Sequence, residues 1–388
     1  MNRRIQSGSQ FALAAIVAGC AFFYFLIFAQ FGFLNRLQGI YQDDRIIEVV
    51  MFVMGIGGIV SSVITARRFR IETSTRWIGS GFVGCGLAAI TAMLTEIIWL
   101  QLAVAGAVGV FLGALTVSIV PMLRAMVRGA RIGLCASVAV GGAYFCSNLP
   151  FVFRCSPEDH CLIAAAVCCV GVFAILKVPR MKQKEIEEAS VCDRTPSGFF
   201  ETKGVWIVAT LFVGLIWLDS AVFYIIQETD TLKSSSWGTD TQLWLNASAH
   251  LLFALLAGWL MDRGYVFGVL VVAFLFLEGG AYLLEHGGEF SVFATPLYVV
   301  GVSLYSACLV GYGALAAEGG SRWRISSRAG VVFALGGWFG SAMGIGMARD
   351  MRSVPVAFLL VALLLALSAL LARWRLWDGT RLTKLNNA

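Results

Sequence analysis

Long apolar segments separated by short polar connectors run through the whole chain. A helix that crosses a bilayer needs about 20 mostly apolar residues, and twelve segments meet this requirement. They lie near residues 11–34, 46–66, 77–94, 98–122, 131–153, 161–178, 204–227, 241–261, 265–284, 293–317, 328–348 and 354–374. The pattern therefore predicts an all-α polytopic membrane protein with 12 transmembrane helices.

The longest polar stretch, residues 179–203, divides the predicted helices into six and six. It mixes charges with proline, serine and glycine, a composition typical of a linker. We therefore expect an N-terminal six-helix bundle at 1–178, a cytoplasmic linker at 179–203, and a C-terminal six-helix bundle with a short cytoplasmic tail at 204–388.

The lysines and arginines indicate the orientation in the membrane. Of the 29 basic residues, 23 fall on one side of the predicted topology and 6 on the other. Positive residues favour the cytoplasmic side, so we expect both termini to be cytoplasmic. The asymmetry also supports an even number of spans, because a missed or false span would scramble the alternation.

The composition agrees with a chain that is dissolved in lipid. Hydrophobic residues make up 59% and charged residues 13%, against roughly 25% charged in an ordinary soluble domain, and the mean hydropathy is +0.81. The net charge of +6 does not indicate nucleic-acid binding, because the basic residues lie at the ends of apolar segments. The first apolar run, Phe11 to Leu34, is longer than a signal-peptide core of about 7 to 15 residues, so we interpret it as a span.

The two halves resemble each other faintly. The fifth predicted span opens Arg131-Ile-Gly133, the eleventh opens Arg328-Ala-Gly330, and each then reaches a Gly-Gly pair. The same offset carries the second span onto the eighth and the first onto the seventh. Weak internal symmetry is typical of transporters built from repeats, and chance similarity among glycine-rich helices is the alternative.

A short motif follows the eighth predicted span, where the chain reads Gly258-Trp-Leu-Met-Asp262-Arg263-Gly264. It resembles the G-x-x-x-D-R signature between the second and third helices of each half in the major facilitator superfamily. The resemblance implies that Asp262 caps a neighbouring helix and locks an inner gate, since anions are favourable at helix N-termini. Gly258, Asp262 and Arg263 are therefore the candidate gating motif.

The equivalent place in the first half departs from the signature, because Ser62 stands where the acid would be. The resemblance otherwise covers the whole chain through the six-plus-six layout. It implies alternating access around a central cavity lined chiefly by the first, fourth, seventh and tenth helices. The third, sixth, ninth and twelfth helices would be peripheral.

Ionisable side chains inside the predicted spans need a reason, since a buried charge costs at least about 2.5 to 3.5 kcal/mol on insertion scales. Asp219 lies in the outer half of the seventh span and could bind a proton, a cation or a cationic substrate, or simply form an interhelical hydrogen bond with Asn246 or His250. Those two residues are four apart on one helical face and could form a proton relay with Asp219, or could be ordinary packed residues. Glu278 lies on the ninth span, and we expect it to be structural.

Aromatic and amide groups supply further candidates. Tyr298, Tyr305 and Tyr312 recur every seven residues on the tenth span and could line a cavity for a ring-bearing solute, or could equally be packing or interfacial residues. On the first span, Tyr24 and Gln30 are weaker candidates of the same kind. The candidate substrate or proton-coupling residues are Asp219, His250, Asn246, Gln30, Tyr24, Tyr298 and Tyr305.

Sulfur-containing residues support two minor hypotheses. Met343, Met347 and Met351 recur every fourth residue on the eleventh span, which would suit a soft metal such as Cu(I), although such stripes are usually core filling. Cys155 and Cys161 border a predicted outer loop, where a loop-closing disulfide is the favoured interpretation. We expect no bound metal and no cofactor.

These observations favour a secondary active transporter that moves a small solute by alternating access and is proton-coupled or a uniporter. The chain contains no H-E-x-x-H, G-x-S-x-G or P-loop lysine motif, so we do not expect an enzyme. A transporter-like sensor or assembly factor, or a metal transporter, is the alternative. We expect a monomeric, multi-pass protein of the inner membrane whose partners are the lipid bilayer, a solute of unknown class and protons. The few basic residues within the spans argue against a multiply charged anion.

Overall fold

A computed structural model describes residues 2–127, 131–178, 202–286, 292–315, 322–349 and 351–385. Within these residues every regular element is a helix, and 11 helices are long and apolar enough to cross a membrane. One shorter apolar helix, at Ile132–Ser147, completes the set. The prediction of an all-α polytopic fold with 12 membrane helices is therefore confirmed, and the chain is a multi-pass membrane protein.

The helices of the first half account for six spans, the first and fifth of which are interrupted. They are α1 (Asn2–Tyr24), η1 (Phe25–Gly32), α2 (Phe33–Tyr41), α3 (Asp44–Arg68), η2 (Ile71–Thr73), α4 (Ser74–Leu94), α5 (Ile98–Met126), α6 (Ile132–Ser147), α7 (Pro150–Phe153) and α8 (Pro157–Leu176). The predicted linker at 179–203 lies almost wholly outside the described residues.

The second half repeats this plan and adds a short helix between its first two spans. Its elements are α10 (Thr202–Glu228), α11 (Asp230–Trp237), α12 (Asp240–Met261), α13 (Val266–His286), α14 (Ala294–Leu315), α15 (Arg322–Val331), η6 (Val332–Gly340), α16 (Ser341–Ala348) and α17 (Val356–Leu385). The twelfth apolar span ends at Trp374, as expected, and its helix α17 continues beyond the span to Leu385.

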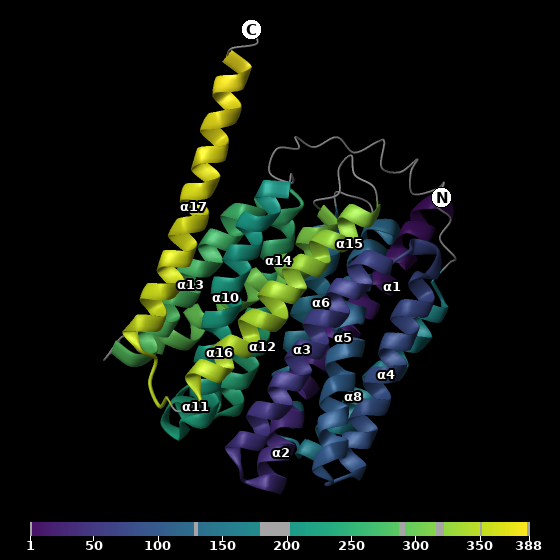
Figure 1. The fold of residues 1–388 in the computed structure, drawn as a ribbon, viewed down its shortest axis with the longest axis vertical. Coiled ribbons are helices and arrows are strands. Elements are labelled where there is room, and N and C mark those ends of the chain that lie inside the picture. Colours follow the sequence, from purple (N-terminus) through teal and green to yellow (C-terminus); the bar gives the residue numbers. More distant parts are fainter. Residues whose placement is uncertain are drawn as a thin grey trace.

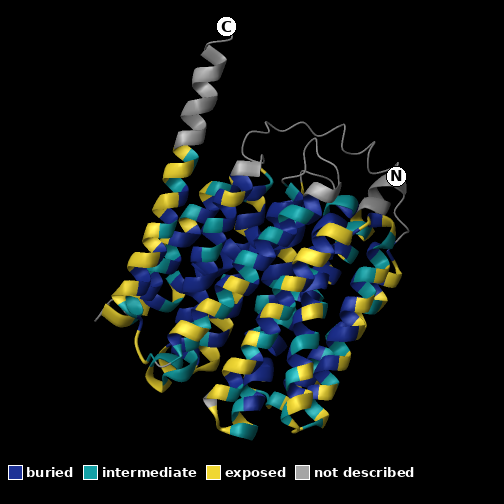
Figure 2. Ribbon diagram, in the orientation of Figure 1, coloured by how far each residue is buried: buried dark blue, intermediate teal, exposed yellow. Residues whose placement is uncertain are grey.

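The spans run side by side, with those of the first half on one side of the molecule and those of the second half on the other (Figure 1). Both chain termini lie at the same end, and α17 projects beyond the other helices there. Buried residues fill the middle of the bundle while exposed ones follow the outward faces (Figure 2). Those outward faces carry large apolar side chains such as Phe52, Leu87 and Leu252, which suits contact with lipid tails.

Two spans contain π-helical stretches that the hydropathy pattern does not reveal. The first is η1, at Phe25–Gly32 within the first span, and the second is η6, at Val332–Gly340 within the eleventh. A π-helical segment widens the backbone spiral and shifts the face on which later side chains lie, and such segments are frequent at functional sites. Both stretches border the cavity described below.

The fifth span is broken where the sequence places a proline. Leu149 is extended, as expected before Pro150, so that α6 ends at Ser147 and α7 begins at Pro150. The Asn148 amide donates to the Tyr144 carbonyl at 2.9 Å and its oxygen accepts from the Trp237 indole at 3.1 Å. The Asn148 side chain thus adds a hydrogen bond at the end of α6 and joins the two halves.

The faint internal repeat corresponds to equivalent contacts between the halves. At the start of α6, Gly133 approaches α12 so closely that an added Cβ would lie 2.6 Å from the Gly258 carbonyl. In α15, Gly330 approaches α3, and its added Cβ would lie 2.5 Å from the Ala66 Cβ. The fifth span therefore packs on the eighth as the eleventh packs on the second.

The expected disulfide between Cys155 and Cys161 is wrong for this structure, since both residues are free thiols. The Cys155 thiol donates to the Val152 carbonyl at 3.0 Å instead. Cys161 lies inside α8 and is buried in the first-half core. Helix formation from Pro157 onward, started by a capping box at Ser156 and Asp159, separates the two sulfurs.

Arg36 connects three segments at the end of the first half that lies away from the termini. Its guanidinium donates to the carbonyls of Ala92 and Met93 at 2.9 and 2.8 Å and forms an ion pair with Glu158. Substituting Arg36→Met is expected to weaken folding by about 1–3 kcal/mol, because the Met93 carbonyl loses its donor. The apparent melting temperature in detergent should fall, whereas Arg45→Met, at an exposed position, should leave it unchanged. Equal shifts in both variants would contradict this role.

Candidate functional site

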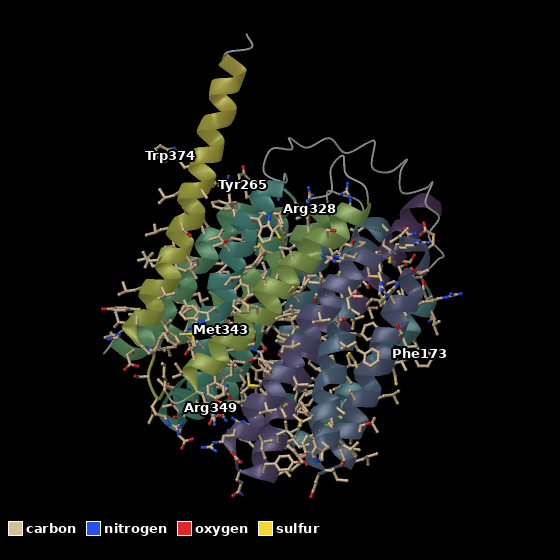
Figure 3. All side chains as sticks on the ribbon, viewed as in Figure 1. Phe173, Tyr265, Arg328, Met343, Arg349 and Trp374 are labelled. Carbon is tan, nitrogen blue, oxygen red and sulfur yellow. The ribbon has the colours of Figure 1, made fainter. Side chains whose placement is uncertain are left out.

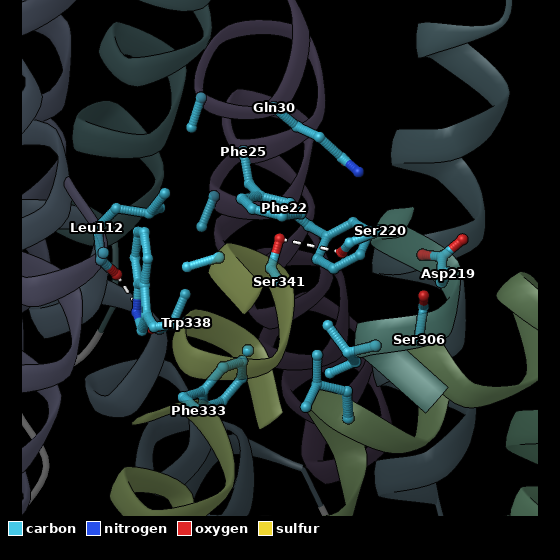
Figure 4. Close-up of a pocket in the computed structure, with 18 of the residues that line it drawn as sticks. Phe22, Phe25, Gln30, Leu112, Asp219, Ser220, Ser306, Phe333, Trp338 and Ser341 are labelled. Atoms are coloured by element: carbon cyan, nitrogen blue, oxygen red, sulfur yellow. Dashed lines mark hydrogen bonds between the residues drawn. The ribbon is translucent and has the colours of Figure 1, made fainter. Parts of the chain in front are cut away.

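Two adjoining cavities lie between the halves of the molecule. The larger is lined by residues of seven spans, and the smaller adjoins it on the side of α11. The walls shared by both cavities include Gln30, Tyr144 and Asp219. Figure 4 shows Gln30 extending its carboxamide across the larger cavity toward the wall that carries Ser220 and Asp219.

The first, fourth, seventh and tenth spans all contribute to the larger cavity, as the family resemblance implies. The second, fifth and eleventh spans contribute as well, through residues such as Met54, Tyr144 and Trp338. None of the lining residues comes from the third, sixth, ninth or twelfth span. The sixth span does reach the smaller cavity, through His160.

Asp219 is the acidic residue of both cavity walls, and its side chain is 5% exposed. The hydroxyl of Tyr298 donates to one carboxylate oxygen and the hydroxyl of Tyr305 donates to the other. These two tyrosines are seven residues apart on one face of α14, so a single helix supplies both donors to α10. An ionised carboxylate can be held at this depth because each of its oxygens has a donor.

The interhelical partners of Asp219 differ from those expected from the sequence. His250 donates or accepts at Nδ1 with the Ser303 hydroxyl at 2.8 Å, and Asn246 donates to the Ser236 carbonyl at 3.0 Å. Within the described residues, neither side chain forms a hydrogen bond with Asp219. The expected relay through Asp219, His250 and Asn246 is therefore not assembled within the part of the chain that the structure describes.

His250 itself lines the smaller cavity, where it packs against Tyr144. The Tyr144 ring stacks on the His250 imidazole with centroids 4.2 Å apart and planes within 4°. The Tyr144 hydroxyl shares a hydrogen bond with Ser306 at 3.2 Å. Tyr144 lines both cavities, and the stacked Tyr144 and His250 rings share the wall of the smaller cavity with Asp219.

The remaining candidates lie away from the cavities. Tyr24 is completely buried and donates to the Cys85 carbonyl at 3.0 Å, toward α4. Glu278 lines neither cavity, and its Oε2 is buried without a hydrogen-bond partner among the described residues. Met343 and Met347 are 42% and 45% exposed, and Met343 lies on the outer surface of the eleventh span (Figure 3).

No group of three or more His, Cys, Asp or Glu side chains among the described residues is placed to hold a metal ion. Met343 and Met347 line neither cavity.

The candidate gating motif lies where α12 meets the start of α6. The two carboxylate oxygens of Asp262 accept hydrogen bonds from the backbone amides of Gly133 and Leu134 at 2.6 and 2.9 Å. Burial raises the pKa of this carboxyl, and the two amide bonds lower it in part. Arg263 folds back over the Trp259 ring of its own helix, 3.5 Å from the centroid. Asp262 and Gly258 thus join the halves, whereas Arg263 forms no hydrogen bond or ion pair with the described residues of the other half.

The opposite end of the molecule is also bridged between halves. Arg154 pairs with Asp240 at 2.9 Å and donates to the Gly238 carbonyl at 2.8 Å. Arg349 forms an ion pair with Glu48. The cavities therefore lie between two sets of contacts that join the halves, one around Asp262 and one around Arg349 and Arg154.

Most cavity-lining residues escaped the sequence analysis, and Tyr144, Trp338 and His160 are three examples. Tyr144 precedes a helix end on a span not expected to line the cavity, Trp338 lies in η6, and His160 follows the Pro157 helix start. His160 is 2% exposed, and its Nδ1 lacks a partner among the described residues. The sequence did offer a reason to consider His160, since it is one of only three histidines in the chain.

Comparisons with known proteins identify the architecture and little else. No family model and no curated protein matches the chain. Among solved structures, the proton:xylose symporter XylE is similar with a TM-score of 0.67 at 13% identity, over 97% of this chain and 96% of that one. The transporter FucP in its outward conformation gives 0.63 at 14% identity, over 94% and 98%. The human organic anion transporter MFSD10 gives 0.63 at 13% identity, over 95% and 99%.

Proposed function

We propose that this chain, which has the fold of the major facilitator superfamily, is a secondary transporter that moves a small solute across the membrane by alternating access. The solute would occupy the cavities between residues 1–178 and 204–388, which rock against each other. Asp219 would carry the substrate charge or the coupling proton. We further propose the inner membrane as its location, with both termini cytoplasmic.

The observation that supports the proposal is the position of Asp219 between the two cavities. Its carboxyl is shared by both walls, so a solute or proton entering from either cavity meets the same group. Its donors Tyr298 and Tyr305 each line a different cavity. A buried ionisable residue is a candidate functional group, and its position in both cavity walls suits a single site with alternating access.

The contacts between the halves supply the two closures that the mechanism needs. Opening toward the Asp262 end requires the Gly133 and Leu134 amides to leave the Asp262 carboxylate. Opening toward the other end requires Arg349 to leave Glu48 and Arg154 to leave Asp240. Each set holds one end while the other opens, so the solute never faces a continuous pore.

Protonation of Asp219 would change this balance through its immediate neighbours. The groups that face it are the hydroxyls of Tyr298 and Tyr305, with Tyr144 and the His250 imidazole behind them. A proton on the carboxyl would convert one acceptor oxygen into a donor and displace one tyrosine hydroxyl. Because both tyrosines lie on α14, that displacement would be transmitted to α14.

Solute flux distinguishes a transporter from a sensor or assembly factor. The purified protein is first screened for thermal stabilisation by a panel of solute classes at pH 5.5 and 7.5, and each hit is then tested for uptake into proteoliposomes. We expect at least one hit to accumulate in protein-containing vesicles and not in protein-free vesicles. Stabilising solutes that never cross the membrane would favour the sensor hypothesis over transport.

A further inference from the structure

The ionisable side chains that line the larger cavity are acidic only. Its lining contains one carboxyl group, that of Asp219, and no lysine, arginine or histidine. An anionic solute would therefore meet no cationic partner there and would approach a carboxylate. A single positive charge would be complementary, and a second would have no counter-charge in this cavity.

The polar side chains of this cavity already have partners within the protein. Thr116 donates to the Leu112 carbonyl at 3.0 Å. The hydroxyls of Ser220 and Ser341 bond to each other at 3.0 Å, as Figure 4 shows. Tyr144 and Ser306 share a bond at 3.2 Å, and Tyr305 donates to Asp219.

Gln30 is the exception, because its carboxamide has no hydrogen-bond partner in the described part of the chain. A polyhydroxylated solute needs many donors and acceptors at once, and the hydroxyls of this cavity offer it only what their internal hydrogen bonds leave unused. The groups with the most unused hydrogen-bonding capacity are the Gln30 carboxamide and the Asp219 carboxylate. An ionised carboxylate has about four lone-pair positions, of which the two tyrosines occupy two.

The rest of the wall is apolar and rich in rings. Phe22, Phe25, Phe333 and Trp338 all line the cavity and lie around the space that Ser220 and Ser341 border (Figure 4). Aromatic faces attract organic cations electrostatically, and the attraction reaches about 2 kcal/mol or more when water is excluded. Rings and a carboxylate together form a site for a cation that carries an apolar body.

We propose that the larger cavity binds an amphiphilic organic monocation, with its charged nitrogen beside Asp219 and its ring or aliphatic body among Phe22, Phe25, Phe333 and Trp338. This inference rests on the proposed transport function and names its substrate class. Gln30 would orient a single polar substituent of the solute. The proposed class differs from the sugars and organic anions named for the similar structures, which share only the fold.

The test compares three ring compounds that differ in charge. Phenyltrimethylammonium is a monocation without an N–H group, tert-butylbenzene is its neutral carbon isostere, and benzenesulfonate is an anion of similar size. Binding to the detergent-purified full chain is measured by isothermal titration, with xylose as the polyol. We expect saturable binding of phenyltrimethylammonium at least about tenfold tighter than that of the other three, since the charge partner is desolvated.

Variants separate the charge from the general effect of a hydrophobic cavity. Asp219→Asn should weaken phenyltrimethylammonium binding at least about tenfold and leave tert-butylbenzene binding unchanged. Glu278→Gln, which also removes a carboxyl from within a span but lines neither cavity, should bind like the wild type. If Asp219→Asn is recovered poorly, Trp338→Leu supplies a second test, with a loss for the cation that exceeds the loss for the neutral isostere.

The possible outcomes address the substrate class and the transport function separately. Equal or tighter binding of benzenesulfonate or xylose would overturn the proposed class, as would no binding of phenyltrimethylammonium at all or unchanged binding in Asp219→Asn. In each of those cases, flux of another solute through the same protein would leave the transport proposal standing. Tight cation binding without any flux would instead support the class and contradict transport.

Discussion

Asp219→Asn is expected to reduce solute flux in proteoliposomes at least about 30-fold, the factor that corresponds to roughly 2 kcal/mol. The wild-type carboxylate accepts from both Tyr298 and Tyr305. An asparagine offers one acceptor oxygen and one amide donor, so one tyrosine hydroxyl faces a donor. The variant therefore loses the negative charge that would bind a cation or a proton, and it also loses one of the two hydrogen bonds to α14.

The pH profile of flux separates these two effects. If Asp219 carries the coupling proton, an inwardly directed proton gradient should stimulate flux by the wild type and leave the residual flux of Asp219→Asn unchanged. Glu278→Gln serves as the matched control and should retain both the rate and the response to the gradient. A variant Asp219→Asn with wild-type flux and wild-type gradient response would show that Asp219 is a structural residue.

A loss of flux caused by misfolding is distinguished with the tyrosines. Tyr305→Phe removes one hydrogen bond to Asp219 while keeping the carboxyl and the ring. It should reduce flux by less than Asp219→Asn does, and the gradient response should remain. If Tyr305→Phe and Asp219→Asn fail equally and both lose thermal stability, the hydrogen bonds rather than the charge explain the defect.

The number of spans could be predicted from hydropathy alone because an apolar run of about 20 residues has few other solutions. The importance of Asp219 could also be predicted from the sequence, since a carboxyl in such a run is costly wherever it lies. The hydrogen-bond partners of Asp219 could not be predicted. Tyr298 and Tyr305 are visible as a stripe of α14, but which helix this stripe faces depends on the packing of α14 against α10.

On the first span, too, the sequence does not show which side chains face the cavities. Tyr24 and Gln30 are six residues apart, and both could be proposed as cavity residues on the basis of polarity alone. In the structure Tyr24 points to the Cys85 carbonyl, while Gln30 lies in η1 and faces both cavities. The π-helical stretch that intervenes has an apolar sequence, Phe25-Leu-Ile-Phe-Ala-Gln-Phe-Gly32, and no hydropathy pattern marks it.

The gating motif illustrates what a resemblance adds to physical reasoning. The position of Asp262 after α12 does not by itself say which helix it caps. The structure supplies that partner, because the carboxylate accepts from two amides at the start of α6. The equivalent position of the first half, Ser62, has a buried hydroxyl without a hydrogen-bond partner among the described residues. The contact of α15 with α3 therefore rests on packing and on the Ser326 hydroxyl, which donates to the Ala66 carbonyl at 2.9 Å.

Because Asp262 bonds to two amides and Ser62 to none, we expect a second large effect at Asp262. Asp262→Ala should open the contact between α6 and α12, because it removes both acceptors from the α6 N-terminus. Hydrogen bonds to a charged group are worth about 1.5–3 kcal/mol each, and the helix dipole adds about 0.3–1 kcal/mol. The lower hydrogen-bond value alone, about 1.5 kcal/mol for a single bond, shifts an open–closed equilibrium about tenfold.

The native thiol of Cys135 reports this opening. It is fully buried two residues beyond Gly133, and it lies 3.7 Å from the Phe11 carbonyl of the first span. Its rate of modification by N-ethylmaleimide, followed by peptide mass spectrometry, should rise about tenfold in Asp262→Ala. Cys308, which is buried in α14, provides the internal control and should not change.

Two substitutions test whether the amide contacts are responsible. Asp262→Asn keeps an acceptor oxygen and should give an intermediate rate at Cys135, since one of the two amides keeps its partner. Ser62→Ala, at the equivalent position of the first half, should leave the rate unchanged because the Ser62 hydroxyl joins no helix of the other half. If N-ethylmaleimide modifies Cys135 no faster in Asp262→Ala than in the wild type, the close approach of Gly133 and Gly258 is sufficient to hold this end shut. In that case Gly258→Val, whose side chain would meet the Ser137 hydroxyl and the Gly133 carbonyl, becomes the variant that opens it.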